Sequence, residues 1–384
     1  MSTDREARHG SYPAVIVPPP TTTTAPNQTS LASRNPPPPP AASESTQYLP
    51  LLQHTMRLAL RTLRTITTSI TTPRAHRLIP FRNTFRKMSS LPSPVLKKPV
   101  KLACIQLASG ADKAANLANA RAKVLEASAA GAKIVVLPEC FNSPYGCDYF
   151  PKYAETLLPS PPTKEQSPSF HALAAMAIES GSYLVGGSVP ELDVETGKFY
   201  NTSLIFSPEG KLLATHRKVH LFDIDIPGKI TFKESEVLSP GDQVTVVDLP
   251  EYGRISVAIC YDVRFPELAA IAARRGCFAL VYPGAFNLTT GPMHWRLLGQ
   301  GRAVDNQIYV AMCSPARDLG ATYHAWGHSL IIDPMANVLV EAEEGEGTVA
   351  WELEGEKIEE ARRNIPINSQ RRFDVYPDVS QGKQ

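Results

Sequence analysis

Three polar side chains stand at the ends of apolar runs and could together perform acid–base and nucleophilic chemistry. Glu139 ends IVVLPE, Lys218 lies in THRKVH, and Cys260 ends RISVAIC. A partly desolvated glutamate can act as a general base, a lysine can stabilise an oxyanion, and a thiolate is a nucleophile. Each residue taken alone has a plainer interpretation, which is a solvated turn for Glu139 and Lys218 and core packing for Cys260.

The residues that follow Cys260 favour a reactive thiol. The stretch YDVRFPELAAIAARRG turns from the apolar strand into a segment with helical spacing. Main-chain N–H groups at the beginning of a helix point toward an anion, so a thiolate placed there is stabilised and nucleophilic. The sequence therefore predicts a nucleophile at Cys260, provided that a base and a cation fold next to it.

The segments LPE, HRKVH and CYDVRFPE occur in this order and resemble the Glu-Lys-Cys triad of the nitrilase superfamily of carbon–nitrogen hydrolases. The resemblance covers residues 99–376 and includes a second glutamate, Glu234 in KITFKES, sixteen residues after Lys218. It implies a four-layer α-β-β-α sandwich that dimerises through a helical face. One small departure is Asp305, where many members of the superfamily carry glutamate.

Within the superfamily, ECFNSPYG, YPGAFNLTTGPMHW, RAVDNQ and SPARD resemble the omega-amidases. Those enzymes hydrolyse the terminal amide of 2-oxoglutaramate and 2-oxosuccinamate. The resemblance implies that Glu139 takes the thiol proton of Cys260, and that the thiolate attacks the amide carbon to form a thioester. It further implies that Lys218 and the main-chain N–H of Tyr261 hold the oxyanion, while Glu234 orients Lys218 or the substrate amide.

The carboxylate of such a substrate calls for a cation. Arg264, four residues beyond the proposed nucleophile, is the candidate, and Tyr145 is expected to shape the pocket. The alternative for Arg264 is a structural ion pair with Asp262 or Glu267.

Two other functions stay open at this level. Sister branches that act on deaminated glutathione or on N-carbamoyl compounds share the triad, and the domain could also be a non-catalytic oligomeric scaffold. No glycine-rich phosphate-binding motif opens a helix after a strand, and hydrolysis by a thiol needs no cofactor. The pairs His216/His220 and His324/His328 match no metalloprotease motif, so we expect them to form hydrogen bonds rather than bind metal.

The elements that must position these residues alternate along the chain, which indicates an α/β domain with helices outside the sheets. Apolar runs predict strands at 100–108, 132–139, 182–191, 200–208, 254–260, 278–286 and 308–316, and a hairpin over 328–342 around Asp333. Helical spacing and Ala-rich composition predict helices at 115–131, 167–181, 267–276 and 293–307.

Residues 1–98 differ in composition from the domain at 99–376 and the short tail at 377–384. Residues 1–99 contain 16 of the 35 prolines, with 13 basic and 3 acidic residues, so they carry a net charge of +10 while the remainder carries −8. We expect residues 1–98 to be disordered. The acidic remainder gives no reason to expect nucleic-acid binding, and six dispersed cysteines indicate reduced thiols in an intracellular protein.

Residues 56–90 are rich in arginine, serine and threonine and hold no acidic residue, which is typical of a mitochondrial transit segment. This segment begins at an internal Met56, and a second internal Met88 follows it. We expect a cytoplasmic form, a mitochondrial form, or both, according to the start used. No apolar run approaches the length of a membrane span, so no membrane partner is expected.

Overall fold

The computed structural model describes residues 94–375, so the predictions made for residues 1–93 and for the tail lie outside the described residues. Residues 94–98, which the sequence assigned to the extension, pack against the domain. Leu96 is buried and forms a β-bridge with Gly253. The folded chain therefore begins before Pro99, because Leu96 is withdrawn from water. Within the described part, no helix is long and apolar enough to cross a membrane.

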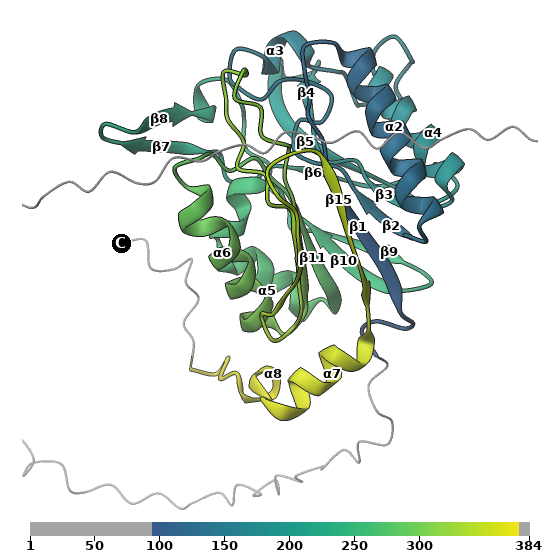
Figure 1. Cartoon of the computed structure of the whole chain (residues 1–384), viewed down its shortest axis with the longest axis vertical. Coiled ribbons are helices and arrows are strands. Elements are labelled where there is room, and N and C mark those ends of the chain that lie inside the picture. Colours follow the sequence, from purple (N-terminus) through teal and green to yellow (C-terminus); the bar gives the residue numbers. More distant parts are fainter. Residues whose placement is uncertain (1–93, 376–384) are drawn as a thin grey trace, which may run out of the picture. The chain divides into compact units, whose positions relative to one another are not determined.

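Two large sheets form the centre of the domain (Figure 1). The larger has seven strands, in the order β15 (Gly347–Leu353), β1 (Val100–Gln106), β2 (Ile134–Val136), β3 (Tyr183–Val185), β5 (Lys198–Phe206) and β4 (Val189–Asp193), with β6 (Leu212–Arg217) also pairing with β5. The smaller has six, in the order β14 (Val338–Glu341), β13 (Leu330–Ile332), β12 (Tyr309–Cys313), β11 (Cys277–Pro283), β10 (Gly253–Val257) and β9 (Thr245–Leu249).

Helices cover the outer face of each sheet, so the predicted four-layer α-β-β-α sandwich is confirmed (Figure 1). The larger sheet carries α2 (Lys113–Ala129) and α4 (Pro168–Ser180), and the smaller carries α5 (Pro266–Arg274) and α6 (Gly291–Asn306). The remaining elements are the short α3 (Phe150–Tyr153), the C-terminal α7 (Gly355–Asn364) and α8 (Ile367–Gln370), and a hairpin of β7 (Asp223–Ile226) with β8 (Ile230–Lys233).

The apolar runs are continuous because both faces of each sheet are buried. In β1, Leu102 and Cys104 join the core between the two sheets, whereas Ala103 and Ile105 join the core beneath α2 and α4. Alternate residues of one strand thus serve two different cores, as the two-residue period of a strand requires. This arrangement fixes the strand ends at which the candidate residues lie.

The strand predicted at 182–191 is wrong as a single element, since β3 and β4 are separate strands there. Gly187 lies between them with φ +57°, and a Cβ at this position would come within 2.0 Å of the carbonyl oxygen of Pro138. The chain therefore leaves the strand conformation at a position that only glycine accepts.

Candidate active site

Cys260 lies where the smaller sheet ends at a tight turn. It follows β10 and begins the 3₁₀ turn Cys260–Arg264, with φ +48°, a left-handed conformation that is unfavourable for a residue with a side chain. Gly284 packs against this turn, and a Cβ there would lie 3.0 Å from the Cα of Cys260. Such a backbone persists only when its surroundings hold it, and the side chain is almost entirely buried.

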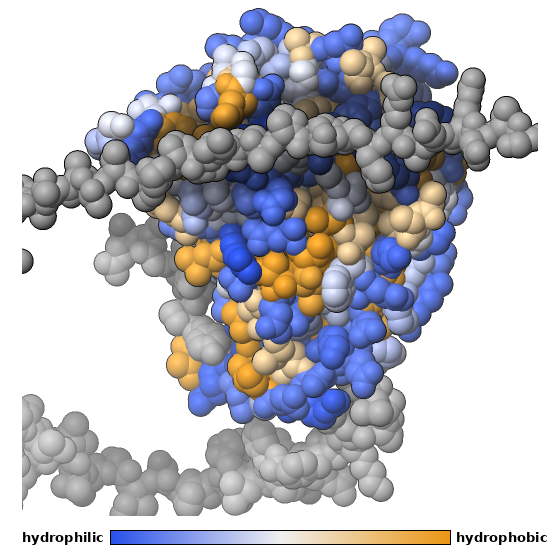
Figure 2. All heavy atoms as spheres, viewed as in Figure 1, coloured by the Kyte–Doolittle hydropathy of each residue, from blue (hydrophilic) through white to orange (hydrophobic). Residues whose placement is uncertain are grey.

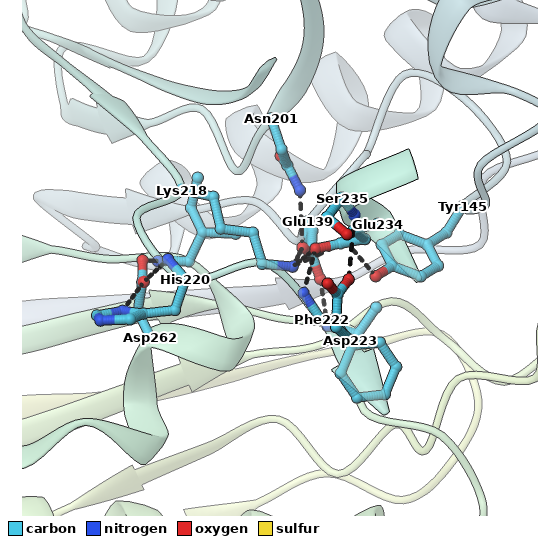
Figure 3. A network of polar contacts seen from close by, with 12 residues as sticks. Glu139, Tyr145, Asn201, Lys218, His220, Phe222, Asp223, Glu234, Ser235 and Asp262 are labelled. Atoms are coloured by element: carbon cyan, nitrogen blue, oxygen red, sulfur yellow. Dashed lines mark hydrogen bonds and ion pairs between the residues drawn. The ribbon is translucent and has the colours of Figure 1, made fainter. Parts of the chain in front are cut away.

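Glu139 and Lys218 approach Cys260 from the larger sheet. Glu139 follows β2 and Lys218 follows β6 directly, and Lys218 Nζ lies 3.1 Å from Glu139 Oε1. Neither side chain has any exposed surface. Cys260 packs against Gly284, and the next residue, Ala285, donates its main-chain N–H to the Glu139 carboxylate at 2.7 Å. The structure therefore brings together three residues that are far apart in sequence (Figure 3 draws Glu139 and Lys218).

Glu234 holds the lysine from the other side. It begins a 3₁₀ turn after β8, and its carboxylate lies 2.9 Å from Lys218 Nζ. It also accepts hydrogen bonds from the Tyr145 hydroxyl at 2.6 Å and from the main-chain N–H of Phe222 at 2.7 Å. The ammonium group of Lys218 thus sits between two buried carboxylates, as Figure 3 shows.

Two partners of Glu139 were not predicted from the sequence. Asn201 Nδ2 in β5 donates to Oε1 at 2.8 Å, and the main-chain N–H of Ala285 donates to Oε2 at 2.7 Å. Ala285 follows β11 in the segment YPGAF. This segment was part of the resemblance to the omega-amidases, but no role was predicted for its residues. The position of Ala285 directly after a buried strand was the available signal, whereas Asn201 lies inside a strand and had none.

The electrostatics of the cluster favour a neutral thiol beside a charged lysine. Burial raises the pKa of Glu139 above its ordinary 4.5, although Lys218 acts in the opposite direction. Burial and the neighbouring Glu139 also raise the pKa of Cys260 well above 9.0. Burial disfavours the charge on Lys218, but Glu139 and Glu234 raise its pKa well above 10.5. A nucleophilic Cys260 would therefore need a base to remove its proton, and the buried Glu139 carboxylate is the titratable group predicted for that role.

A cavity of about 260 Å³ opens beside this cluster. Its lining includes Glu139, Tyr145, Ala285 and Tyr323 near the triad, and Ser109, Tyr149, Asp318 and Thr322 elsewhere. Tyr145 stacks on Phe232 of β8, with ring centroids 5.8 Å apart. The residue predicted to shape the pocket thus lines the cavity and also contacts Glu234.

The other two predicted binding residues, Tyr261 and Arg264, lie in the turn that Cys260 begins. Tyr261 is half-buried and contacts the ring of Phe222. Arg264 does not line the cavity that contains Glu139. Its Nη1 lies 3.2 Å from His294 Nδ1, its buried Nε has no partner, and it forms neither predicted ion pair among the described residues.

His216 and His220 form hydrogen bonds, as predicted, and both rings contact the carboxylate of Asp262. From the sequence, Asp262 was expected only as an alternative ion-pair partner of Arg264, so this network was not predicted. Among the described residues, no group of three or more side chains of the metal-binding types is arranged to hold an ion.

The chain is similar to known proteins over nearly all of the described residues. A family model described as carbon–nitrogen hydrolase matches residues 101–363. Omega-amidase NIT3 of Saccharomyces cerevisiae is 52% identical over 75% of this chain and 98% of its own length. Omega-amidase NIT2 of Homo sapiens is 53% identical over 72% of this chain and 96% of its own.

Solved structures agree with this similarity. The crystal structure of Saccharomyces cerevisiae Nit3, described as a member of branch 10 of the nitrilase superfamily, superposes with a TM-score of 0.67 at 49% identity. It covers 73% of this chain and 98% of that one. The Caenorhabditis elegans NitFhit protein gives a TM-score of 0.64 at 30% identity, over 73% of this chain and 66% of that one.

Proposed function

This chain belongs to the carbon–nitrogen hydrolase family, and from that premise we propose that it is an omega-amidase. It hydrolyses the terminal amide of 2-oxoglutaramate and 2-oxosuccinamate to the dicarboxylate and ammonia. The observation that carries the proposal is a buried cluster in which the Glu139 carboxylate accepts from the Lys218 ammonium and from the N–H of Ala285, directly after the Gly284 that packs on Cys260. Identity of 52–53% to two proteins named omega-amidase supports the choice of reaction.

The first half of the reaction forms a thioester. Glu139 takes the thiol proton, and the sulfur of Cys260 bonds to the amide carbon as the carbonyl becomes an oxyanion. Lys218 and the main-chain N–H of Tyr261 stabilise that oxyanion. When the C–N bond breaks, Glu139 returns its proton to the leaving nitrogen and ammonia departs.

The second half hydrolyses the thioester. A water molecule gives a proton to Glu139 and its oxygen attacks the thioester carbon. The C–S bond then breaks, and the sulfur recovers the proton from Glu139. The raised pKa of Glu139 suits it to accept and release a proton in both halves. Lys218 keeps its charge throughout, because Glu234 pairs with it.

Arg264 is our proposed partner for the substrate carboxylate. Its buried Nε has no protein partner, and its guanidinium group lies beside the ring of Tyr261, 5.2 Å from the centroid. Arg264→Lys removes the planar fork while keeping the charge, so it should raise KM about tenfold with little change in kcat. An unchanged KM would assign the arginine a structural role.

The test of the proposed activity is ammonia release from three substrates, namely 2-oxoglutaramate, deaminated glutathione and an N-carbamoyl amino acid. We expect the highest kcat/KM on 2-oxoglutaramate and no release by Cys260→Ala. Cys260→Ser is the matched control, because its hydroxyl keeps the shape of the thiol but ionises far too weakly for this base. A preference for either other substrate, or turnover by Cys260→Ala, would refute the proposal.

The enzyme also pairs as a homodimer through α5 and α6. The exposed apolar residues of these helices are Ile271, Met293, Leu297 and Val304, and Figure 2 shows apolar surface over this part of the molecule. Leu297→Glu should give a monomer in analytical ultracentrifugation. Val194→Glu, which changes an equally exposed valine beyond β4, should leave the dimer intact.

A further inference from the structure

Asp262 is a buried carboxylate for which the proposed mechanism has no role. It lies two residues beyond Cys260 and its side chain has no exposed surface. Oδ2 accepts from the main-chain N–H of Ile259 at 2.9 Å and from His216 Nε2 at 3.1 Å. Oδ1 accepts from the main-chain N–H and from Nδ1 of His220, at 2.9 and 2.8 Å.

The carboxylate is ionised in this arrangement. Burial opposes its charge, but the hydrogen bonds from His216 and His220 hold the pKa of Asp262 well below its ordinary 3.8. An ionised carboxylate can only accept hydrogen bonds, so both imidazoles present an N–H to it. Charge-assisted bonds of this kind are stronger than those between neutral groups.

These bonds connect two of the three segments of the chain that carry the triad. His216 lies in β6 of the larger sheet and His220 in the segment that follows it, so the two flank Lys218, whereas Asp262 belongs to the turn that Cys260 begins after β10 of the smaller sheet. Figure 3 shows the ring of His220 directed at Asp262, while the side chain of Lys218 extends away toward Glu139. The Asp262 carboxylate therefore links the Cys260 turn to the residues on either side of Lys218.

We propose that Asp262 is a positioning residue that fixes the Cys260 turn against the Lys218 segment through His216 and His220. The inference rests on the proposed function, since it takes Cys260 as the nucleophile and Lys218 as the oxyanion partner. Glu139 and Lys218 come from the same sheet, but Cys260 comes from the other one. The relative placement of the two sheets therefore sets the attack geometry, and a displacement of about 1 Å at a reacting centre costs about 100-fold in rate.

The experiment compares Asp262→Asn with wild type on 2-oxoglutaramate, with active sites counted by incorporation of iodoacetamide at Cys260. Asparagine keeps the size of the side chain but cannot accept all four hydrogen bonds. We expect kcat per active site to fall about 100-fold while KM changes less than about threefold. Glu155→Gln is the matched control. Glu155 is a buried, hydrogen-bonded carboxylate like Asp262, but it contacts neither the Cys260 turn nor the segment that carries Lys218.

His220→Phe decides the question if Asp262→Asn does not fold. The His220 ring stacks on Phe265 with centroids 3.5 Å apart, and phenylalanine preserves both that stacking and the main-chain bond to Asp262. Only the ring hydrogen bond is lost, so kcat should fall about tenfold at nearly constant KM. The double variant with Asp262→Asn should be no slower than Asp262→Asn alone, because both changes remove one linkage.

The proposal is overturned if folded His220→Phe keeps its kcat within twofold of wild type. It is also overturned if Asp262→Asn matches Glu155→Gln in kcat and KM. Wild-type turnover that disappears in Cys260→Ala shows that the proposed function stands independently of either result.

Discussion

Two buried glutamates on the side of the larger sheet each pair with a lysine, yet the surroundings of the two carboxylates differ. Glu155 receives Lys113 Nζ at 2.8 Å, the hydroxyl of Ser167 at 2.7 Å, and both the hydroxyl and the main-chain N–H of Ser169 at 2.6 and 2.9 Å. Glu139 receives Lys218, one amide side chain and one main-chain N–H.

The lysines differ more than the carboxylates do. Lys113 has one carboxylate partner and about a quarter of its side chain is exposed, whereas Lys218 has two carboxylate partners and no exposure. At the triad, one ammonium group pairs with two buried carboxylates. Burial and the neighbouring Glu234 then raise the pKa of Glu139, even though Lys218 lowers it. A carboxylate whose hydrogen-bonding capacity is filled, such as Glu155, stabilises the fold. A carboxylate with fewer hydrogen-bond donors, such as Glu139, can accept and release a proton.

Glu139→Gln removes the group that this comparison treats as the base, so it should cause the largest loss. We expect kcat/KM on 2-oxoglutaramate to fall about 1,000-fold, within the range of general acid–base catalysis. In wild type the activity should decline as pH falls through the raised pKa of Glu139, so the acid limb lies above pH 4.5. Because glutamine does not titrate, the residual activity should lack this limb. An unaltered acid limb in the variant would assign it to another group.

Glu234→Gln sharpens the comparison by leaving Lys218 with one carboxylate, as Lys113 has. We expect kcat to fall about 100-fold, because the oxyanion partner loses its orientation. Glu234 raises the pKa of Glu139, so its removal should lower that pKa and move the acid limb of the residual activity to lower pH. A limb that stays in place or moves to higher pH would contradict the assigned coupling.

The three triad residues were predictable because each directly follows a strand or an apolar run. A residue that follows a buried strand lies at the end of the sheet, where its side chain can meet those of neighbouring strands. A carboxylate, an ammonium and a thiol that meet there are more easily explained by chemistry than by packing. The resemblance then selected one chemistry for the set. The order of the main apolar strands and of α2, α4, α5 and α6 followed from periodicity in the same way.

What could not be predicted depends on the pairing of distant segments. The N–H of Ala285 belongs to the backbone, so its side chain carries no sign of the bond to Glu139. Asp262 contacts two histidines more than 40 residues away, and no local pattern encodes that contact. The β7–β8 hairpin alternates between exposed and half-buried residues, so it lacks an apolar run, and β6, β9 and β15 were likewise not predicted.

Tyr145→Phe tests a single hydrogen bond of the cluster formed by Glu139, Lys218 and Glu234. The hydroxyl gives Glu234 one hydrogen bond at 2.6 Å, and phenylalanine keeps the stacking on Phe232. Loss of one hydrogen bond to a charged group should lower kcat about tenfold, with a change in KM that reflects only the lining of the cavity. A loss as large as that of Glu234→Gln would mean that Tyr145 itself contacts the reacting atoms.

Glu155→Gln should have the smallest effect on catalysis and a clear effect on stability. The change leaves Lys113 without its ion-pair partner and disturbs the bonds to Ser167 and Ser169. Breaking a buried pair from one side costs about 3–5 kcal/mol, but Lys113 can turn to water, so we expect a loss of about 2–3 kcal/mol in the free energy of unfolding. Denaturant unfolding measures this loss, and kcat per active site should stay within twofold of wild type. If kcat instead fell tenfold in the folded variant, Glu155 would be coupled to the reaction. The number of hydrogen-bond donors would then not explain why Glu139 is catalytic and Glu155 is structural.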